Sequence, residues 1–277
     1  SSSRAFAGYR EGAPAYQDVK DTKSTEHYQI VRAYIDTNAV VRSAQDAIVE
    51  ALNVGTSKAD LKGGQTYSFV GVVTAKLVTR GYYLTEAWVG AGAVVTAGQD
   101  ILVHGKTTCT ADSDASSTTL AMFVDADTTY ATVDVTVGTG ASVGKNATLD
   151  AARVISVLAE ADNIQDSKTE LVGKGSFNIS KKGIVAHNNL GRTVSTSIGT
   201  GAHLTSDFGN ILIKAIAGAG DSLSTRSTIG NGFSFAGYAN VRTYTNITSE
   251  ALVTVNPGVV IKDTFNGVDV YADSSIK

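Results

Sequence analysis

Three acidic residues are the strongest candidates for catalytic chemistry in this chain: Asp134, Asp150 and Glu160. Two carboxylates on neighbouring strands can act as acid and base, or as a nucleophile, when a polysaccharide is cleaved. Acidic residues do not cluster around these three beyond the density of a solvated surface, and the longest variable stretches are rich in Ser and Thr. We therefore expect no enzyme and no catalytic residues, and a polysaccharide hydrolase or lyase stays open as an alternative.

Two short acidic motifs, Asp112-Ser-Asp114 and Asp125-Ala-Asp127, could hold a calcium ion through loop oxygens. Neither resembles an EF-hand or the Gly-rich calcium repeat. The four histidines are scattered without an i, i+4 pair, and the Gly-x-Gly pairs lack the third Gly of a dinucleotide loop. We expect no cofactor and no metal site, with calcium as an alternative for the two acidic motifs.

Four aromatic residues are candidates for binding rather than catalysis: Tyr82, Tyr83, Trp88 and Tyr238. Exposed rings of this kind serve as stacking platforms for sugars, and this would make the chain a glycan-binding module. The alternative is that the same rings pack in the core or at an interface. Both interpretations stay open at this point, and the favoured one is packing.

A recurring phrase of seven residues organises the chain around these candidates. It opens with Val or Ile, has a polar or Gly-rich centre, and has an apolar residue at its fifth and seventh positions. Its five copies are Ile35–Val41, Val89–Val95, Val137–Val143, Ile198–Leu204 and Val255–Ile261. Such a regular recurrence indicates a repeat architecture in which units bury their apolar faces by stacking.

A second alternating run follows each phrase after a short polar turn. The five runs are Ala47–Ala51, Ile101–Val103, Leu149–Ala151, Ile211–Ala215 and Val268–Ala272. Because strand side chains alternate, one column of apolar residues should face the core in every copy, for example Val89, Ala93, Val95, Ile101 and Val103. In the fifth copy, Pro257-Gly258 suits a type II turn. Val40, Val94 and Val260 point the other way, so they are either covered locally or simply exposed.

The unit length suggests more than one winding per repeat. Aromatic landmarks at Tyr67–Gly71 and Phe233–Gly237 precede the phrases at Val89 and Val255 by the same interval, and Gly175–Ile179 lies nearly in the same register before Ile198. If each winding uses about 20 residues, a unit holds two to three windings, and five units form a rod of roughly 50–65 Å. The sequence thus predicts an all-β, right-handed parallel β-helix of five repeats of about 48–61 residues.

Composition agrees with long hydrogen-bonded ladders. The chain has 28 Gly but only 2 Pro in 277 residues, and Pro cannot donate to a ladder. The opening of the chain is more charged and irregular, so we predict a cap or docking arm over residues 1–30, with a divergent winding as an alternative, and a solenoid over 31–277. Cys109 is the single cysteine, so it forms no internal disulfide and is expected to be buried.

The phrase Val89–Val103, preceded by alternating Thr, Val and Ala, resembles the β-helical repeats of large bacterial secreted exoproteins, the filamentous-haemagglutinin and leukotoxin-type adhesins. Related phrases cover most of residues 31–273. The resemblance implies a right-handed parallel β-helix, an extracellular or cell-surface location, and a role as stalk or adhesive fibre. It carries over no catalytic residues.

We therefore expect a non-catalytic structural segment of a surface fibre. The chain stops directly after the fifth copy without a polar capping winding, and an open solenoid end pairs with another chain. The predicted partners are further copies or further protein, end to end, or a host or matrix glycan. A net charge of −3 without a basic stripe argues against nucleic acid and anionic membrane partners, and no stretch approaches 18 uninterrupted apolar residues, so we expect no membrane insertion.

Overall fold

The computed structural model describes residues 16–173, 179–230 and 236–275, and these ranges contain strands and turns without any helix. Every strand pair in them is parallel. The strands are β1 (Tyr16–Ile35), β2 (Val40–Ser43), β3 (Ala47–Val89), β4 (Val94–Ala97), β5 (Ile101–Val143), β6 (Thr148–Ala151), β7 (Ile155–Gly173), β8 (Ile179–Ile198), β9 (His203–Ser206), β10 (Ile211–Ala217), β11 (Ser222–Gly230), β12 (Ala236–Val255), β13 (Val260–Asp263) and β14 (Val268–Ser274). The predicted parallel β-helix is confirmed.

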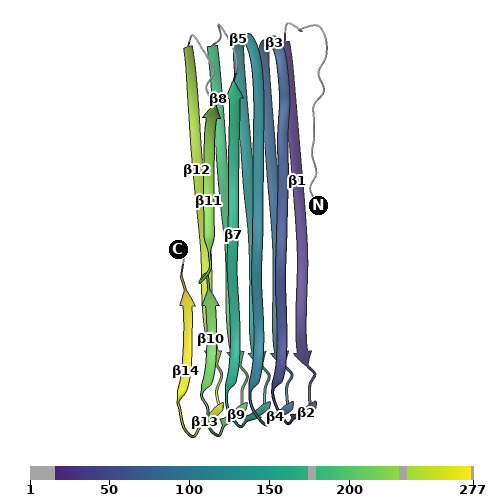
Figure 1. The fold of residues 1–277 in the computed structure, drawn as a ribbon, viewed down its shortest axis with the longest axis vertical. Coiled ribbons are helices and arrows are strands. Elements are labelled where there is room, and N and C mark those ends of the chain that lie inside the picture. The colour runs from purple at the N-terminus through teal and green to yellow at the C-terminus, as the bar shows by residue number, and fades with distance from the viewer. Residues whose placement is uncertain (1–15, 174–178, 231–235, 276–277) are drawn as a thin grey trace.

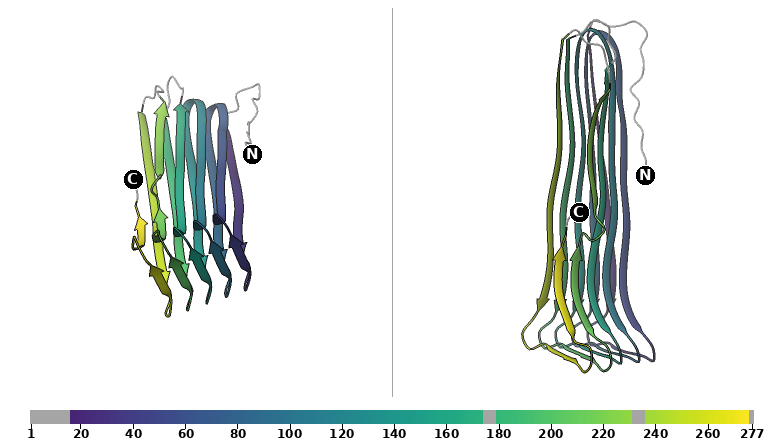
Figure 2. Two further views of the ribbon diagram at one scale, coloured as in Figure 1. Left: turned by 60° about the horizontal axis from the view of Figure 1, so that its bottom comes forward. Right: turned by 60° about the vertical axis from the view of Figure 1, so that its left-hand side comes forward.

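Each winding has two long limbs and one short base (Figure 1). The outgoing face is made by the first parts of β3 and β5 together with β7, β10, β11 and β14. The return face is made by β1, the second parts of β3 and β5, β8 and β12. The short strands β2, β4, β6, β9 and β13 form a separate sheet across the base, visible in Figure 2.

One repeat is one winding, and the prediction of two to three windings per repeat is wrong. Ala47 pairs with Ile101, which pairs with Ile155, so a full winding separates each of these residues from the next. The long limbs explain the period, because about 20 residues in a strand span roughly 65 Å. Five windings stacked at about 4.8 Å extend only about 20–25 Å along the stacking axis. The predicted rod is therefore replaced by a slab whose long axis follows the strands (Figure 1).

The predicted position of the third copy of the phrase is wrong by six residues. Val89 pairs with Val143, and Val143 pairs with Ile198, so the third corner is Val143–Leu149 rather than Val137–Val143. The second run of that winding accordingly starts at Ile155 and not at Leu149. The true starts of the phrase are Ile35, Val89, Val143, Ile198 and Val255, as the strand pairing shows.

The backbone geometry of the corner explains why the phrase recurs and why the predicted position of its third copy is wrong. Its third turn residue has a positive φ in all five copies: Asn38 (58°), Gly92 (67°), Asn146 (54°), Gly201 (69°) and Gly258 (73°). Gly adopts this region without strain, and Asn is one of the few other residues that visit it. In the third copy, Asn146 takes the position that Gly holds in the second, fourth and fifth copies. Gly138 and Gly140 lie in a straight part of β5, but their spacing gives a similar sequence pattern six residues earlier. The positive φ of Gly258 after Pro257 is the one that a type II turn requires at this position.

The inward columns form the core as predicted. Val89, Ala93, Val95, Ile101 and Val103 are buried, and so are their counterparts in the fourth winding. The main apolar cluster fills the end of the slab near the base sheet, and a smaller cluster that includes Leu61 and Leu77 lies farther along the limbs. Val40, Val94 and Val260 lie outward in one column of the base sheet, and both Val40 and Val260 are exposed.

Polar side chains fill much of the interior between these apolar clusters. Thr107 of the outgoing face hydrogen-bonds across the core to Thr85 and Thr139 of the return face, with both oxygen pairs 2.6 Å apart. Buried Ser, Thr and Asn residues make similar contacts farther along, such as Asn188 Nδ2, which donates to the Ser224 carbonyl. The two long faces are thus joined by hydrogen bonds as well as by apolar packing, since a buried polar group needs a partner.

The predicted boundary at residue 30 is not present in the structure. Strand β1 crosses it, and Tyr16 to Ile35 pair in unbroken register with Val70 to Val89. Residues 16–30 therefore belong to the first winding, and residues 1–15 lie outside the described part. Of the aromatic landmarks, Tyr67–Gly71 lies in β3 near the far end of the limbs. The other two fall mostly on residues 174–178 and 231–235, which are outside the described part.

Candidate aromatic groove on the return face

Two pairs of stacked aromatic rings stand on the outer surface of the return face. Tyr28 of β1 stacks on Tyr82 of β3 with ring centroids 4.7 Å apart, and Tyr34 stacks on Trp88 with centroids 4.6 Å apart. The rings of each pair are 5° from parallel. They meet because the register of β1 on β3 makes the two members of each pair direct neighbours. Side chains in neighbouring parallel strands lie close enough to stack when they share a column.

Both stacks end at the third winding. The position beside Tyr82 is Thr136, and the position beside Trp88 is Ser142. The next winding continues this second column with Ser197. The surface therefore drops from aromatic rings to small side chains between β3 and β5.

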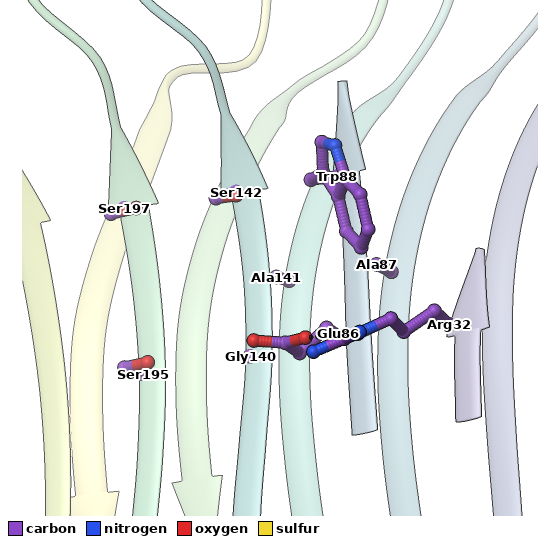
Figure 3. Close-up of a pocket in the computed structure, with 9 residues that line it drawn as sticks. All are labelled: Arg32, Glu86, Ala87, Trp88, Gly140, Ala141, Ser142, Ser195 and Ser197. Atoms are coloured by element: carbon purple, nitrogen blue, oxygen red, sulfur yellow. Dashed lines mark hydrogen bonds and ion pairs between the residues drawn. The ribbon is translucent and has the colours of Figure 1, made fainter. Parts of the chain in front are cut away.

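This drop creates a groove of about 520 Å³ beside Trp88 (Figure 3). Trp88 forms one wall, and small residues of β5 and β8 form the floor. Arg32 and Glu86 cross the lower end, with Arg32 Nε donating to Glu86 Oε2 at 2.7 Å. The lining residues are Arg32, Glu86, Ala87, Trp88, Gly140, Ala141, Ser142, Ser195 and Ser197.

A second depression of about 310 Å³ lies farther along the same face, beside Tyr28 and Tyr82. Its charged residues are paired, since Arg80 Nη1 donates to Glu26 Oε1 at 2.8 Å and Arg80 Nε lies 3.8 Å from Asp134 Oδ2. The two depressions thus have a common plan, in which a stacked aromatic pair ends beside a position with a small side chain.

The four predicted platform residues do not form one site. Tyr82 and Trp88 lie on the outer surface in separate depressions, and Tyr238 is exposed on β12 at the other end of the stack. Tyr83 is fully buried, so the packing interpretation is correct for this residue. Burial, and to a smaller extent Cys109, raises the pKa of the Tyr83 hydroxyl to about 12. Its ring occupies the space that side chains at Gly55 and Gly81 would otherwise fill.

The three candidate carboxylates lie on three different sheets or faces. Asp134 is on the return face, where Asn189 Nδ2 donates to it at 2.5 Å. Asp150 is on the base strand β6 and exposed. Glu160 is on the outgoing face and pairs with Lys106 at 3.2 Å and with His104 at 3.4 Å. The structure therefore brings no two of them together as an acid and base.

The acidic motifs proposed for calcium are also divided. Asp112 and Asp114 lie on the outer surface of the outgoing face, paired with Lys58 at 2.7 Å and Lys168 at 3.7 Å. Asp112 raises the pKa of Lys58, and burial raises the pKa of Asp114. Asp127 is buried in the interior, and the side chain of Asp125 lies outside the described part. Within the described residues, no three His, Cys, Asp or Glu side chains gather as a metal site.

Cys109 is buried as predicted, and its thiol donates to Asn163 Oδ1 at 2.6 Å. Burial raises the pKa of the thiol to about 12; Asp221 adds to this effect and Arg192 opposes it. The thiol is therefore protonated at neutral pH and is not a nucleophile.

Sequence reasoning missed a buried ion pair in the interior. Arg192 Nη1 lies 2.7 Å from both Oδ1 and Oδ2 of Asp221, and both side chains have no exposed area. Asp221 enters the interior at the break between β10 and β11, where the register on β7 shifts: Ala217 pairs with Ala161, but Ser222 pairs with Ile164. The signal in the sequence was Gly218-Ala-Gly220-Asp221, a turn-forming segment inside an otherwise regular limb.

Comparison of the chain with models of known protein families, with curated proteins and with solved structures gives no match in any of the three. A search of the described residues also finds no helix that is both long and apolar enough to cross a membrane.

Proposed function

We propose that this chain is a non-catalytic structural segment of an extracellular surface fibre, of the kind found in filamentous-haemagglutinin and leukotoxin-type adhesins. In this proposal its terminal windings stack on further windings of the same kind, supplied by further copies or by further protein. The single observation that supports it is the last described winding, whose inward side chains are those of a core but are left partly exposed.

The last described winding shows this clearly. Val255, Val268 and Val270 occupy the columns of Ile198, Ile211 and Ile213. The three isoleucines are fully buried, whereas the three valines are 43%, 41% and 46% exposed. Within the described part of the chain, the backbone of β12, β13 and β14 pairs on one side only. An unpaired edge of this length is a template for another strand.

The first described winding offers a complementary edge. Ile35 lies in the same column as Val255, Ala47 lies in the column of Val268, and Val49 lies in the column of Val270. A second copy stacked in register would place each of these apolar side chains next to its counterpart. The corners would also continue, since the N–H of the residue with positive φ in each of the first four corners donates to the next corner, as Asn38 N does to the Ala91 carbonyl at 2.9 Å.

Sedimentation of the purified chain over a range of concentrations tests this proposal. We expect species larger than the monomer to accumulate with concentration and to appear as slabs extended along the stacking axis in electron micrographs. Val270→Glu places a charge on the exposed inward column and should abolish this association. Tyr271→Glu adds the same charge to the outward face of the same strand and is the matched control.

A monomer at every concentration, together with equal sedimentation of the two variants, would contradict stacking through this edge. Turnover of any member of a polysaccharide panel by the purified chain would contradict the non-catalytic part of the proposal.

A further inference from the structure

We propose that the groove beside Trp88 binds a neutral glycan, with one pyranose ring stacked on the open face of the indole. The groove lies on the outer surface of the return face, and its residues are separate from the edges that stack in the proposed fibre. Three observations support it: the interrupted aromatic stack, the hydroxyl-lined floor, and the internally neutralised charges.

The interrupted stack supplies the apolar contact. One face of Trp88 is covered by Tyr34 with ring centroids 4.6 Å apart, a distance close to the strand spacing. On the other side the next position in the column is Ser142, whose side chain is too small to cover the ring. A pyranose ring can therefore occupy the next place in the stack, above Ser142, with the C–H bonds of one face directed at the indole. The apolar C–H face of a sugar stacks on an aromatic ring in this way because the ring face carries partial negative charge.

The floor supplies hydrogen-bonding groups at the edge of that ring. Ser142, Ser195 and Ser197 line the groove, and each hydroxyl can both donate and accept. These are the properties needed to bind sugar hydroxyls. Gly140 keeps the floor low between them, because it has no side chain. The groove thus combines one apolar wall with several polar groups, the usual composition of a small-molecule site.

The charges in the groove favour a neutral ligand. The charged residues that line it are Arg32 and Glu86, which are bonded to each other at 2.7 Å. An anionic sugar would gain little from an arginine that is already paired with a carboxylate. The pair can still accept and donate hydrogen bonds to hydroxyls through its remaining atoms.

The second depression indicates how a longer glycan would run. Tyr82 lies six positions before Trp88 on β3 and faces the same way, so the two ring faces are about 20 Å apart along the strand. Tyr82 also ends a stack beside a small residue, Thr136. An oligosaccharide lying along β3 and β5 would contact both rings, and this direction is parallel to the strands.

Trp88 is the only tryptophan of the chain, and its fluorescence reports directly on this groove. The probes are the neutral tetrasaccharides cellotetraose, maltotetraose, mannotetraose and chitotetraose, with a sulfated tetrasaccharide as the charged comparison. We expect a saturable change in emission with at least one neutral probe at a Kd of about 1 mM or tighter, and no saturable change with the sulfated one. Ligand-observed NMR gives a second readout that does not depend on the indole.

Ser142→Tyr is the decisive variant, because it extends the existing stack, fills the groove and removes no aromatic residue. It should weaken binding of the neutral probe at least tenfold by NMR. Thr132→Tyr places the same ring outward on the same strand, away from the groove, and should bind as the parent chain does. Trp88→Ala, also measured by NMR, provides a second test should Ser142→Tyr fail to fold, as judged by circular dichroism.

Three results would overturn this proposal. They are the absence of saturable binding for all four neutral probes, binding that survives both Ser142→Tyr and Trp88→Ala, and tighter binding of the sulfated probe than of any neutral one. None of them bears on stacking of the terminal windings, which sedimentation tests separately.

Discussion

The buried Arg192–Asp221 pair allows the sharpest test of how the interior is stabilised, through the isosteric change Asp221→Asn. This change removes the negative charge and leaves the guanidinium of Arg192 in a site where neither side chain is exposed. Leaving one partner of a buried ion pair uncompensated costs about 3–5 kcal/mol. Arg192 retains contacts to Ser249 Oγ, at 3.1 Å from Nε and 2.8 Å from Nη2. We therefore expect the lower end of this range, about 3 kcal/mol.

Amide hydrogen exchange is the appropriate assay because stacked windings can open separately. A loss of about 3 kcal/mol corresponds to exchange about 100-fold faster in the segments that open with the pair. These segments are β11 and β8, which meet across the core at this point. The N–H of Asn163 donates to Asp221 Oδ1 at 2.9 Å and serves as a local reporter. Amides of β4 and β2, two and three windings away, should exchange at the parent rate.

The double variant Arg192→Met with Asp221→Asn separates the loss of a partner from the loss of an interaction. Replacing both charges removes the uncompensated guanidinium, so its stability should be within about 1 kcal/mol of the parent chain. If Asp221→Asn alone changes exchange less than threefold, the pair does not carry the stability assigned to it. If the double variant is as unstable as the single one, the cost comes from lost packing rather than from an unpaired charge.

Three further predictions concern the buried thiol, the packing around Tyr83 and the corners. Folding raises the pKa of the Cys109 thiol and so favours its protonated form. Alkylation at pH 8 should therefore proceed only as fast as the chain opens. The free energy of unfolding should fall as the pH rises from about 9 towards 12. Rapid alkylation of the native chain would contradict its burial. In Gly55→Ala the new Cβ would lie 1.9 Å from Tyr83 Cε1, so thermal unfolding should show a loss of at least about 1–3 kcal/mol, partly restored by Tyr83→Leu. Gly92→Ala and Gly258→Ala share the strain of a positive φ, and the atom that a Cβ at Gly92 would meet is Oδ1 of the exposed Asn38 side chain, which can rotate away. Both variants should therefore lose about 1–2 kcal/mol in thermal unfolding, and no loss in either would argue against the corner geometry.

The sequence allowed the fold class to be predicted because the corner and the inward columns are local patterns. A Gly or Asn that tolerates positive φ, an apolar residue after it and a fixed gap to the next alternating run are all visible within one short stretch of the chain. The length of a winding was not visible in the same way. Nothing local distinguishes a long limb that runs straight from one that bends, so each repeat was expected to hold several windings where the structure has one.

A periodic signal for the site was nevertheless present at the correct spacing. Tyr28 and Tyr82, Tyr34 and Trp88, and Arg32 and Glu86 are all 54 residues apart, and each pair is in contact. Matching outward side chains at the interval between the first two phrases would have identified these ladders. The polar interior could not have been found by such a search. Its contacts join the two faces of the slab, and the residues that meet across it, such as Thr85 and Thr107, depend on where the limb turns.

The position of the aromatic groove follows from the different structural constraints on inward and outward side chains in a solenoid. An inward column must remain apolar or hydrogen-bonded in every winding, and the corner must keep a residue that tolerates positive φ. Outward columns carry no such constraint, so their side chains can change from one winding to the next without disturbing the backbone. A column of aromatic rings that continued through all windings would be a structural ladder with no free face. The column that begins with Tyr34 and Trp88 changes to Ser142 and Ser197 halfway along the stack, and this interruption leaves one face of the indole open to a ligand.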